Sequence, residues 1–520
     1  MSGLETSERP VDAAAIAERE GEEVAAADAR EPLVLAIDIG TSSVRAALFD
    51  GRGREVAGTL ARVERGFRTT PDGGAEADAG ELIAQVESVI DESLARSSVS
   101  NIEAVAVACF WHSLVGIDES GRALTPIYGW SDTRAAAEAE ALRQRYDERA
   151  MHRRTGCRFH AGYWPAKLLW LRKENPEVCS AVGRWVSPGE FLTLKLCGEV
   201  AASVSMASGT GLLDQRRCVW DEAMLDITGL SESQLPPLAA AGWTFRLTDD
   251  YARRWPPLRD ARWFPVIGDG AANNVGADCV DQSAAALMIG TSGAMRVAWA
   301  GEPPAALPAG LWCYRVDHRR VVVGGALSDG GGLYDWLSDS LKLGADTEAN
   351  EAVLSALEPD AHGLTVLPFW AGERSTGWSA EARGAILGLT TNTRPIEIVR
   401  AAMEAIAYRF ALIAESLLPF APGAEIRASG GALTASPTWT QILADVLGRP
   451  LNLAPAREAS SRGAVLLALE ALDVIEDIAK LPARAPDQIF TPDAARHALY
   501  LDGLARQQRA YDALVREPSS

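Results

Sequence analysis

The chain has 520 residues, of which 48% are hydrophobic and 23% charged, and its formal net charge is −20. This length predicts more than one domain, and the acidic balance argues against a nucleic-acid partner and against docking on an anionic membrane. No apolar run approaches the ~18 residues that cross a bilayer. The seven cysteines are scattered and include no CxxC pair, which predicts a reducing, cytoplasmic setting without a zinc site or a disulfide framework.

Residues 1–31 precede the first strand pattern and are rich in Ala, Glu and Asp. They lack the charged and apolar regions of a signal peptide, so we expect a disordered or weakly helical tail. A first domain is expected over residues 32–277. It opens with the hairpin pattern LVLAIDIGTSSVRAALFD, continues with helical periodicity from Asp78 to Arg96, and reaches the buried-strand run IEAVAVACF. Together these patterns predict an α/β layer architecture.

The Trp-rich stretch from Tyr128 to Arg262 is mixed in character, and we interpret it as an insertion that carries specificity. A second domain is expected over residues 278–475, opening with the hairpin pattern SAAALMIGTSGAMRVAWA. Helices are predicted from Pro395 to Leu418 and from Pro437 to Leu447, with SSRGAVLLALEAL as a last core helix. Residues 476–520 are expected to form a C-terminal segment that is helical and exposed.

The sequence Ile-Gly-Thr-Ser occurs twice, at Ile39 to Ser42 and at Ile289 to Ser292, each time between two β-prone runs. A Gly-Thr-Ser turn exposes backbone N–H groups and hydroxyls, which are the groups that bind phosphate oxygens. Two such turns suggest two related halves that close on one phosphorylated ligand. The candidate phosphate-binding residues are Gly40, Thr41, Ser42, Ser43, Arg45, Gly290, Thr291 and Ser292.

One carboxylate distinguishes the two turns, because Asp38 precedes the first and Met288 holds the same place before the second. A single carboxylate fits one metal–phosphate unit between the halves, with Asp38 facing Mg²⁺ through a water molecule. The alternative for Asp38 is an ordinary hairpin turn with a capping Asp. Both interpretations remain open at this point.

Two glycine-rich stretches are candidates for contact with the nucleotide. IRASGGA places Gly430, Gly431 and Ala432 between a strand and a helix, where a flat backbone surface suits an adenine ring or a ribose. The alternative is a strand-to-helix turn that needs positive φ. The run from Gly330 to Gly332 is either a nucleotide wall or a flexible turn, and Gly331 and Asp335 join the candidates.

Asp269 is the candidate general base. GDGAANNVG follows the strand-like ARWFPVI and places this Asp at a strand end, flanked by glycines. A carboxylate there can take the proton of an alcohol that attacks phosphorus. The alternative is an Asx-turn or a helix N-cap.

Five further residues are candidates for the acceptor pocket. Trp111 and His112 follow the apolar run IEAVAVACF, and His112 suits a substrate hydroxyl, or else it is a satisfied buried histidine. Asp132 and Arg134 offer an acceptor and a forked donor for polyols and carboxylates, or else they start a surface helix. Lys167 either reaches the pocket or simply packs. Walker A, HExxH, GxSxG and strand–GxGxxG signatures are absent from the sequence, which disfavours those ATPase, protease, hydrolase and dinucleotide-binding classes.

These motifs, in this order, resemble the FGGY family of carbohydrate kinases from about Leu33 to Leu472. The most specific match is GAILGL, then seven residues, then EIVRAAME. The resemblance implies an α/β fold of two domains, the actin-like ATPase (ribonuclease H-like) type with a central cleft. It also implies ATP and Mg²⁺ as cofactors, phosphate and adenosine loops at the positions above, Asp269 as catalytic residue, and sugar contacts from Trp111, His112 and Asp269.

Within the family, stretches such as GDGAANNVG and GGALSDGGGLYDWL are most similar to gluconokinases. The expected function is therefore ATP-dependent phosphorylation of a terminal hydroxyl of a sugar or sugar acid, with gluconate first. Arg134 and Lys167 are the candidate partners of a gluconate carboxylate. Family members often have Met-His-Gly where this chain has Trp111-His112-Ser113, which predicts a different sugar pocket.

Three alternatives remain. One is a xylulose, ribulose or polyol kinase of the same family, and the second is a non-catalytic, actin-like nucleotide switch. The third is a sugar-sensing regulator, which the acidic charge and the absence of a basic DNA-binding module disfavour. The expected partners are a small sugar or sugar acid and ATP, and a homodimer is left open.

Overall fold

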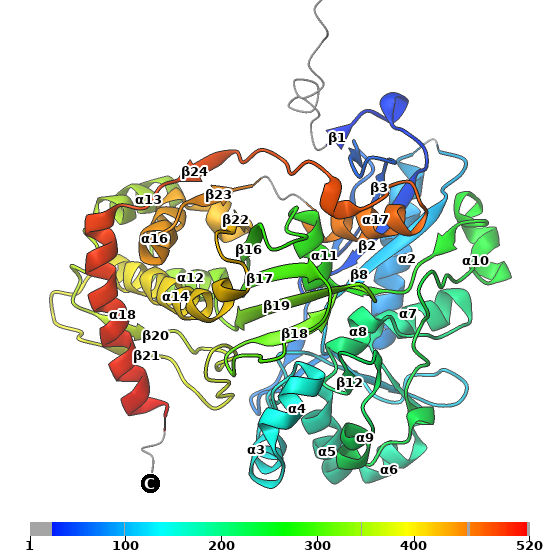
Figure 1. Cartoon of the computed structure of the whole chain (residues 1–520), viewed down its shortest axis with the longest axis horizontal. Coiled ribbons are helices and arrows are strands. Elements are labelled where there is room, and N and C mark those ends of the chain that lie inside the picture. The colour runs from blue at the N-terminus through cyan, green and yellow to red at the C-terminus, as the bar shows by residue number, and fades with distance from the viewer. Residues whose placement is uncertain (1–22, 98, 345, 455–457, 517–520) are drawn as a thin grey trace, which may run out of the picture.

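The computed structural model describes residues 23–97, 99–344, 346–454 and 458–516. Two mixed β-sheets organise the chain into two lobes, the first on the right and the second on the left of Figure 1. The first sheet contains β1 (Glu23–Val24), β2 (Val34–Ile39), β3 (Ser43–Phe49), β4 (Glu55–Val56), β5 (Ala61–Glu64), β8 (Ala104–Cys109), β14 (Arg262–Trp263) and β15 (Ile267–Gly268). The second contains β16 (Ala284–Ile289), β17 (Gly293–Ala300), β18 (Trp312–Arg315), β19 (Arg320–Leu327), β22 (Glu425–Ser429), β23 (Leu451–Leu453) and β24 (Gln488–Phe490).

The two sheets repeat one topology. In the first, β2 pairs antiparallel with β3 and parallel with β8, and β3 pairs antiparallel with β5. In the second, β16 pairs antiparallel with β17 and parallel with β22, and β17 pairs antiparallel with β19. The two related halves suggested by the repeated turn sequence are therefore present in the fold.

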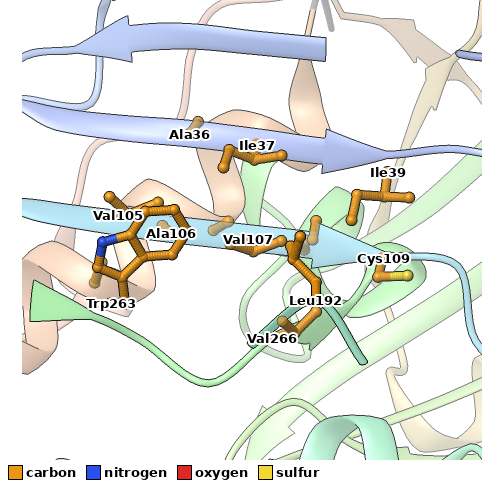
Figure 2. Packing of buried hydrophobic residues seen from close by; sticks show 14 of the residues in the cluster. Ala36, Ile37, Ile39, Val105, Ala106, Val107, Cys109, Leu192, Trp263 and Val266 are labelled. Carbon is orange, nitrogen blue, oxygen red and sulfur yellow. The ribbon is translucent and has the colours of Figure 1, made fainter. Parts of the chain in front are cut away.

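Two strands at the centre of the first lobe are buried along their whole length. All residues of β2 and of β8 are buried, as expected of parallel strands that are covered on both faces. Their register places Ile37 beside Val107 and Ile39 beside Cys109, and Trp263 belongs to the same hydrophobic cluster (Figure 2). This packing holds the segments that leave the ends of β2 and β8 in fixed positions.

The main helices begin and end close to their predicted bounds. α2 (Ala79–Ala95) starts after Asp78, whose side chain accepts the Glu81 N–H, and α14 (Pro395–Leu417) and α16 (Pro437–Leu447) cover the second sheet. The other helices of eight or more residues are α3 (Ala136–Arg145), α4 (Glu148–Thr155), α5 (Trp164–Glu174), α7 (Pro188–Cys197), α11 (Asp269–Gly276), α12 (Gly331–Ser340), α13 (Thr347–Ala356), α17 (Ala459–Ala471) and α18 (Ala494–Leu514). Shorter helices are α6 (Pro176–Ala181), α8 (Val204–Ser208), α9 (Glu222–Thr228), α10 (Asp249–Arg254) and α15 (Gly431–Ala435), and the remaining small strands are β6 (Arg68–Thr69), β7 (Ala75–Ala77), β9 (Val115–Ile117), β10 (Ile127–Tyr128), β11 (Arg184–Val186), β12 (Leu213–Asp214), β13 (Val219–Trp220), β20 (Thr365–Leu367) and β21 (Ala385–Leu387).

The described part of the first lobe begins earlier in the sequence than expected. Residues 1–22 lie outside the described part of the chain, but Glu23 and Val24 form β1, which pairs parallel with β4 at the edge of the first sheet. Val24 is 7% exposed and belongs to the core of the first lobe. The expectation of a disordered tail up to residue 31 is therefore wrong for residues 23–31, because a buried valine and a strand pairing anchor them.

The last part of the chain contributes to both lobes. The expected assignment of residues 278–475 to the second domain alone did not include this exchange. α17 lies over β2 and β8 of the first lobe (Figure 1), and Val465 and Leu469 are buried in that core. The chain then returns to the second lobe through β24 and α18, on the left of Figure 1. Tyr500 and Tyr511 of α18 are buried, so this helix packs against the second lobe and is not simply exposed.

All seven cysteines are free. Within the described residues, no helix is both long and apolar enough to cross a membrane.

Candidate active site

Both Gly-Thr-Ser segments form tight hairpin turns. Gly40–Ser42 connects β2 to β3, and Gly290–Ser292 connects β16 to β17. In each turn the glycine N–H donates to a carbonyl oxygen across the turn, at 2.9 Å in both cases. Among the described residues, the N–H groups of the Thr and the Ser in each turn donate to no protein acceptor. Each turn therefore presents two free donors, which is what an anion such as a phosphate requires.

Three glycine-containing turns meet in the second lobe. Gly331 N–H donates to Gly290 O at 2.7 Å, and Gly332 N–H donates to Thr291 O at 3.1 Å. Gly430 has φ of 103° and lies so close to Ile289 that a Cβ there would be 2.3 Å from the Ile289 carbonyl oxygen. The starts of α12 and α15 are thereby held against the second phosphate turn.

The remaining nucleotide candidates surround this place. A Cβ on Gly331 would lie 3.2 Å from the Cβ of Ala432, so the two glycine stretches are in contact. Gly431 has open space on its Cβ side, with no atom of the described residues within 4 Å. Asp335 is exposed in the second turn of α12. The structure therefore brings the predicted second-lobe candidates together.

Asp269 begins α11, directly after β15. β15 pairs parallel with β8, so Asp269 and the segment after β8 leave the sheet at the same edge. Asp269 Oδ1 accepts the Gly270 N–H at 2.7 Å, whereas the N-cap position of α11 is Gly268 and makes no side-chain cap. The helix-capping alternative is thus wrong for Asp269, and its half-buried carboxylate is available for chemistry.

The charge of Asp269 is balanced from the second lobe. Burial raises its pKa, and the positive charge of Arg296, the Gly270 N–H and the positive charge of Arg374 lower it. Arg296 comes from β17, and a Cβ on Gly270 would lie 3.3 Å from two of its guanidinium nitrogens. Burial lowers the pKa of Arg296 to about 10, while the negative charge of Asp269 raises it. The second hairpin therefore brings a positive charge next to the helix start that carries the candidate base.

Asp38 is close enough to Asp269 for their charges to interact. Burial raises its pKa to about 7, Arg45 lowers it, and the negative charges of Glu458 and Asp269 raise it further. Arg45 Nη1 lies 4.0 Å from Asp38 Oδ2 and 3.1 Å from Glu458 Oε1. Arg45, a candidate phosphate ligand, is thus already paired with carboxylates.

These residues fit a magnesium ion. Three carboxylates repel one another here, and the raised pKa of Asp38 shows that Arg45 only partly offsets burial and its two acidic neighbours. A divalent cation beside Asp38 would remove that penalty, and Mg²⁺ commonly uses one or two carboxylates with water and phosphate oxygens. The compact group Asp360, His362 and Glu404 lies elsewhere, and its carboxylates are already paired with Arg506 and Arg400.

The ring of Trp111 packs against Gly268, the residue that precedes the candidate base Asp269. Its Nε1–H donates to Ser205 O at 2.9 Å, and a Cβ on Gly268 would lie 1.8 Å from its ring. Glycine at that position is required for this close approach. With its only polar hydrogen committed, Trp111 can offer an acceptor only its aromatic surface.

His112 and Lys167 form one unit. His112 has φ of 69°, and its Nδ1 lies 2.5 Å from Gly209 O, so Nδ1 carries the proton and Nε2 is left as an acceptor. Burial lowers the pKa of His112 well below its usual value, and Arg374 lowers it further, so the ring is neutral. Lys167 Nζ donates to His112 O at 3.2 Å and to Gly162 O at 2.7 Å. Lys167 therefore holds the backbone of His112.

Asp132 and Arg134 are joined to each other. Arg134 Nη2 lies 2.6 Å from Asp132 Oδ2 and 2.8 Å from Glu76 Oε1, and the guanidinium lies 4.6 Å from the Trp170 ring. Asp132 also accepts the Ala75 N–H at 3.1 Å. α3 begins at Ala136 without a side-chain cap, so the pair does not start a helix as the alternative predicted.

Three charged residues of the site were not singled out from the sequence as ligands or partners. Arg296 was visible only as a strand residue after the second turn, and Glu458 stands among charged residues beside a helix start. Arg374, in the segment GERST, reaches towards the first lobe, where its guanidinium lies 5.5 Å from the Trp130 ring. Only the spatial pairing of the two lobes reveals their positions.

A well-formed cavity of about 340 Å³ lies beside the site without including its chemistry. Ser205 and Ile267 line it, together with Trp243 and the turn between β18 and β19, but Asp38, Asp269 and the phosphate turns do not. Cavity size alone therefore does not identify the active site in this chain.

Comparison with known proteins agrees with this geometry. The model of the FGGY family of carbohydrate kinases, N-terminal domain, matches residues 33–255, and that of the C-terminal domain matches residues 285–472. A gluconokinase of Bacillus subtilis is 27% identical over 85% of this chain and 88% of its own length, and a xylulose kinase of Escherichia coli is 28% identical over 93% of this chain and 99% of its own length.

Solved structures give the same result. The gluconate kinase of Lactobacillus acidophilus has a TM-score of 0.83 at 27% identity, covering 93% of this chain and 98% of that chain. The ligand-bound xylulose kinase of the same organism has a TM-score of 0.83 at 26% identity, with the same coverage. These likenesses bear out the expected two-domain kinase fold. Since the two family models cover most of the sequence, the chain belongs to the FGGY family of carbohydrate kinases, phosphotransferases with an alcohol group as acceptor.

Proposed function

We propose that this kinase transfers the γ-phosphate of ATP to a terminal hydroxyl of a sugar acid, with gluconate as the first candidate. The observation that carries the proposal is that Asp269 starts α11 beside the guanidinium of Arg296, which follows the second phosphate turn, and interacts electrostatically with Asp38, which precedes the first. A carboxylate between two anion-binding turns suits the activation of an alcohol beside a phosphate chain.

In the proposed reaction, Asp269 accepts the proton of the acceptor hydroxyl as its oxygen attacks the γ-phosphorus. The new bond joins that oxygen to phosphorus, and the bond to the bridging oxygen breaks, so that ADP leaves. The free N–H groups of Gly40–Ser42 and Gly290–Ser292 bind phosphate oxygens from the two lobes. His112 accepts a second substrate hydroxyl at Nε2, because Nδ1 is held by Gly209 O.

Asp38 would hold Mg²⁺, directly or through water, and Arg45 and Glu458 would fix its position. When bound, Mg²⁺ neutralises phosphate charge and orients the γ-phosphate. The positive charge of Arg296 opposes the rise that burial causes in the pKa of Asp269. These roles are proposals that rest on the geometry of the residues.

Gluconate is the first candidate because several short stretches of the sequence resemble gluconokinases. GDGAANNVG, MIGTSGAMR and GGALSDGGGLYDWL are most similar to gluconokinases, and gluconokinases of two Bacillus species are among the similar proteins. Xylulose and glycerol kinases have comparable identity, so a ketopentose or polyol is the second candidate.

A screen of ADP release over aldonates, ketoses and polyols tests the proposal. We expect gluconate to give the highest kcat/KM. Turnover of xylulose with no turnover of gluconate would contradict the gluconate assignment and leave the kinase activity standing. ADP release that no acceptor accelerates would favour the non-catalytic nucleotide switch.

A further inference from the structure

The two cations that the sequence offers for a carboxylate of the acceptor are both occupied. Arg134 is held by Asp132 and Glu76, and its side chain is only 13% exposed. Lys167 is 1% exposed and donates to two backbone carbonyls, those of His112 and Gly162. If either cation bound the acceptor instead, the buried protein groups that it now contacts would lose their partners, which costs free energy. A sugar acid therefore needs a different cation.

Arg374 lies on a backbone that is fixed on both sides. The preceding Glu373 forms a buried ion pair with Arg409. The following Ser375 exchanges two hydrogen bonds with Ala326 of β19, at 2.9 Å and 3.0 Å. The side chain between these two anchors is consequently presented from the second lobe in a defined direction.

The guanidinium of Arg374 points at the first lobe. It lies 5.5 Å from the Trp130 ring, and Trp130 Nε1–H donates to Thr41 Oγ1 of the first phosphate turn at 3.1 Å. Its positive charge acts on both His112 and Asp269, the two groups proposed to bind acceptor hydroxyls. Arg374 thus faces the space between the candidate base and the acceptor pocket.

Arg374 also keeps its hydrogen-bonding capacity. Within the described residues its side chain makes no hydrogen bond and no ion pair, and its ring contact with Trp130 leaves the planar edge of the guanidinium available. A half-buried arginine with five free donors, stacked on an aromatic ring, is well suited to bind a carboxylate in a bidentate manner.

We propose that Arg374 is the specificity-determining residue that binds the carboxylate of the acceptor and selects sugar acids over neutral sugars. The inference rests on the proposed function, because it assumes that the acceptor is a sugar acid. The acceptor then lies with its terminal hydroxyl at Asp269 and its carboxylate at Arg374, and the arginine contributes to ground-state binding more than to the chemical step.

The test compares acceptors in variants of one residue. Arg374→Gln and Arg374→Lys are assayed with gluconate and with glucitol, its neutral analogue, using ADP release and separate values of KM and kcat. Arg383→Gln is the matched control, since Arg383 is exposed in the same segment and, among the described residues, donates only to the Ala380 and Ala382 carbonyls. Arg383→Gln removes one positive charge, as Arg374→Gln does.

We expect Arg374→Gln to raise KM for gluconate by about 10- to 100-fold, the effect of losing a charge-assisted hydrogen bond. The ratio of kcat/KM for gluconate to that for glucitol should fall by a similar factor. Arg374→Lys should recover part of this ratio, and Arg383→Gln should leave it unchanged.

Three results would overturn the inference. An unchanged ratio in Arg374→Gln, with gluconate turned over by the wild type, would remove Arg374 as the carboxylate ligand and leave the proposed function intact. A collapse of kcat with both acceptors and an unchanged KM for gluconate would assign Arg374 to the phosphates. A wild type that uses only neutral acceptors would contradict the sugar-acid assignment itself.

Discussion

Gly276 of α11 and Gly463 of α17 lie back to back, although β16 to β23 of the second lobe separate their helices in sequence. A Cβ on Gly276 would lie 1.8 Å from the Ala459 carbonyl oxygen, and a Cβ on Gly463 would lie 1.8 Å from the Ala272 carbonyl oxygen. The two helix backbones are therefore in direct contact (Figure 1). Since α11 begins with Asp269, this contact sets the position of the candidate base.

Gly463→Ala should consequently impair both stability and catalysis. The added methyl group forces the helices apart, which we expect to lower the free energy of unfolding by about 1–3 kcal/mol. Displacement of Asp269 should reduce kcat by about 10- to 100-fold. Urea denaturation and steady-state kinetics measure the two effects. Gly344→Ala is the control, because a Cβ there meets nothing within 4 Å; equal behaviour of the two variants would show that the contact is unimportant.

Glu190 predicts how the stability of the fold depends on pH. Its Oε2 accepts the Ser187 N–H at 2.7 Å in a capping box at the start of α7, and its Oε1 has no partner among the described residues. Burial raises the pKa of Glu190 from 4.5 to about 7, with the Ser187 hydrogen bonds opposing the change. The folded state therefore binds this proton more tightly than the unfolded state. The stability that this tighter proton binding at Glu190 provides is complete below about pH 4.5, and it is lost as the pH rises through about 7.

Glu190→Gln should remove this loss, because a glutamine stays neutral and its amide oxygen can still accept the Ser187 N–H. Relative to the wild type, the variant should gain as much as about 3 kcal/mol between pH 4.5 and pH 8. Denaturant titrations at both pH values measure the gain. Glu415→Gln, an exposed site on α14, serves as the control. A difference between variant and wild type that does not change with pH would refute this account of Glu190.

Asp38→Asn tests the proposed magnesium ligand. Removing the carboxylate keeps the shape of the side chain but weakens its attraction for a divalent cation. We expect the Mg²⁺ concentration for half-maximal rate to rise at least about 10-fold, with kcat falling as well. Titration of Mg²⁺ at fixed ATP measures the shift, and Asp226→Asn at an exposed position is the control. An unaltered Mg²⁺ dependence would exclude Asp38 from the metal site.

The sequence predicts the local elements well. The two hairpins, α14 and α16 follow from apolar periodicity, glycines and prolines at their ends, which are properties of short segments. The placement of Asp269 after a strand is likewise a local pattern. The repeated turn sequence also indicates the duplicated topology, because both copies come from equivalent strand pairs.

Partners far apart in the chain could not be predicted in this way. An apolar helix pattern shows that α17 is buried but not that the first lobe covers it. The charges of Arg134 and Lys167 are visible in the sequence, whereas their occupation by Glu76 and by the His112 carbonyl depends on the tertiary structure. For the same reason Arg374, which lacks such partners in the described structure, was not among the candidates.

The central claim is that Asp269 removes the proton of the acceptor hydroxyl, and Asp269→Asn tests it most directly. The measurement combines the rate of sugar-phosphate formation with the affinity for ATP determined by calorimetry. We predict that kcat falls by about 10²- to 10⁴-fold while the Kd for ATP stays within a few-fold of the wild type. A fall in kcat of only a few-fold, in a variant that is folded and saturated with both substrates, would contradict the assignment.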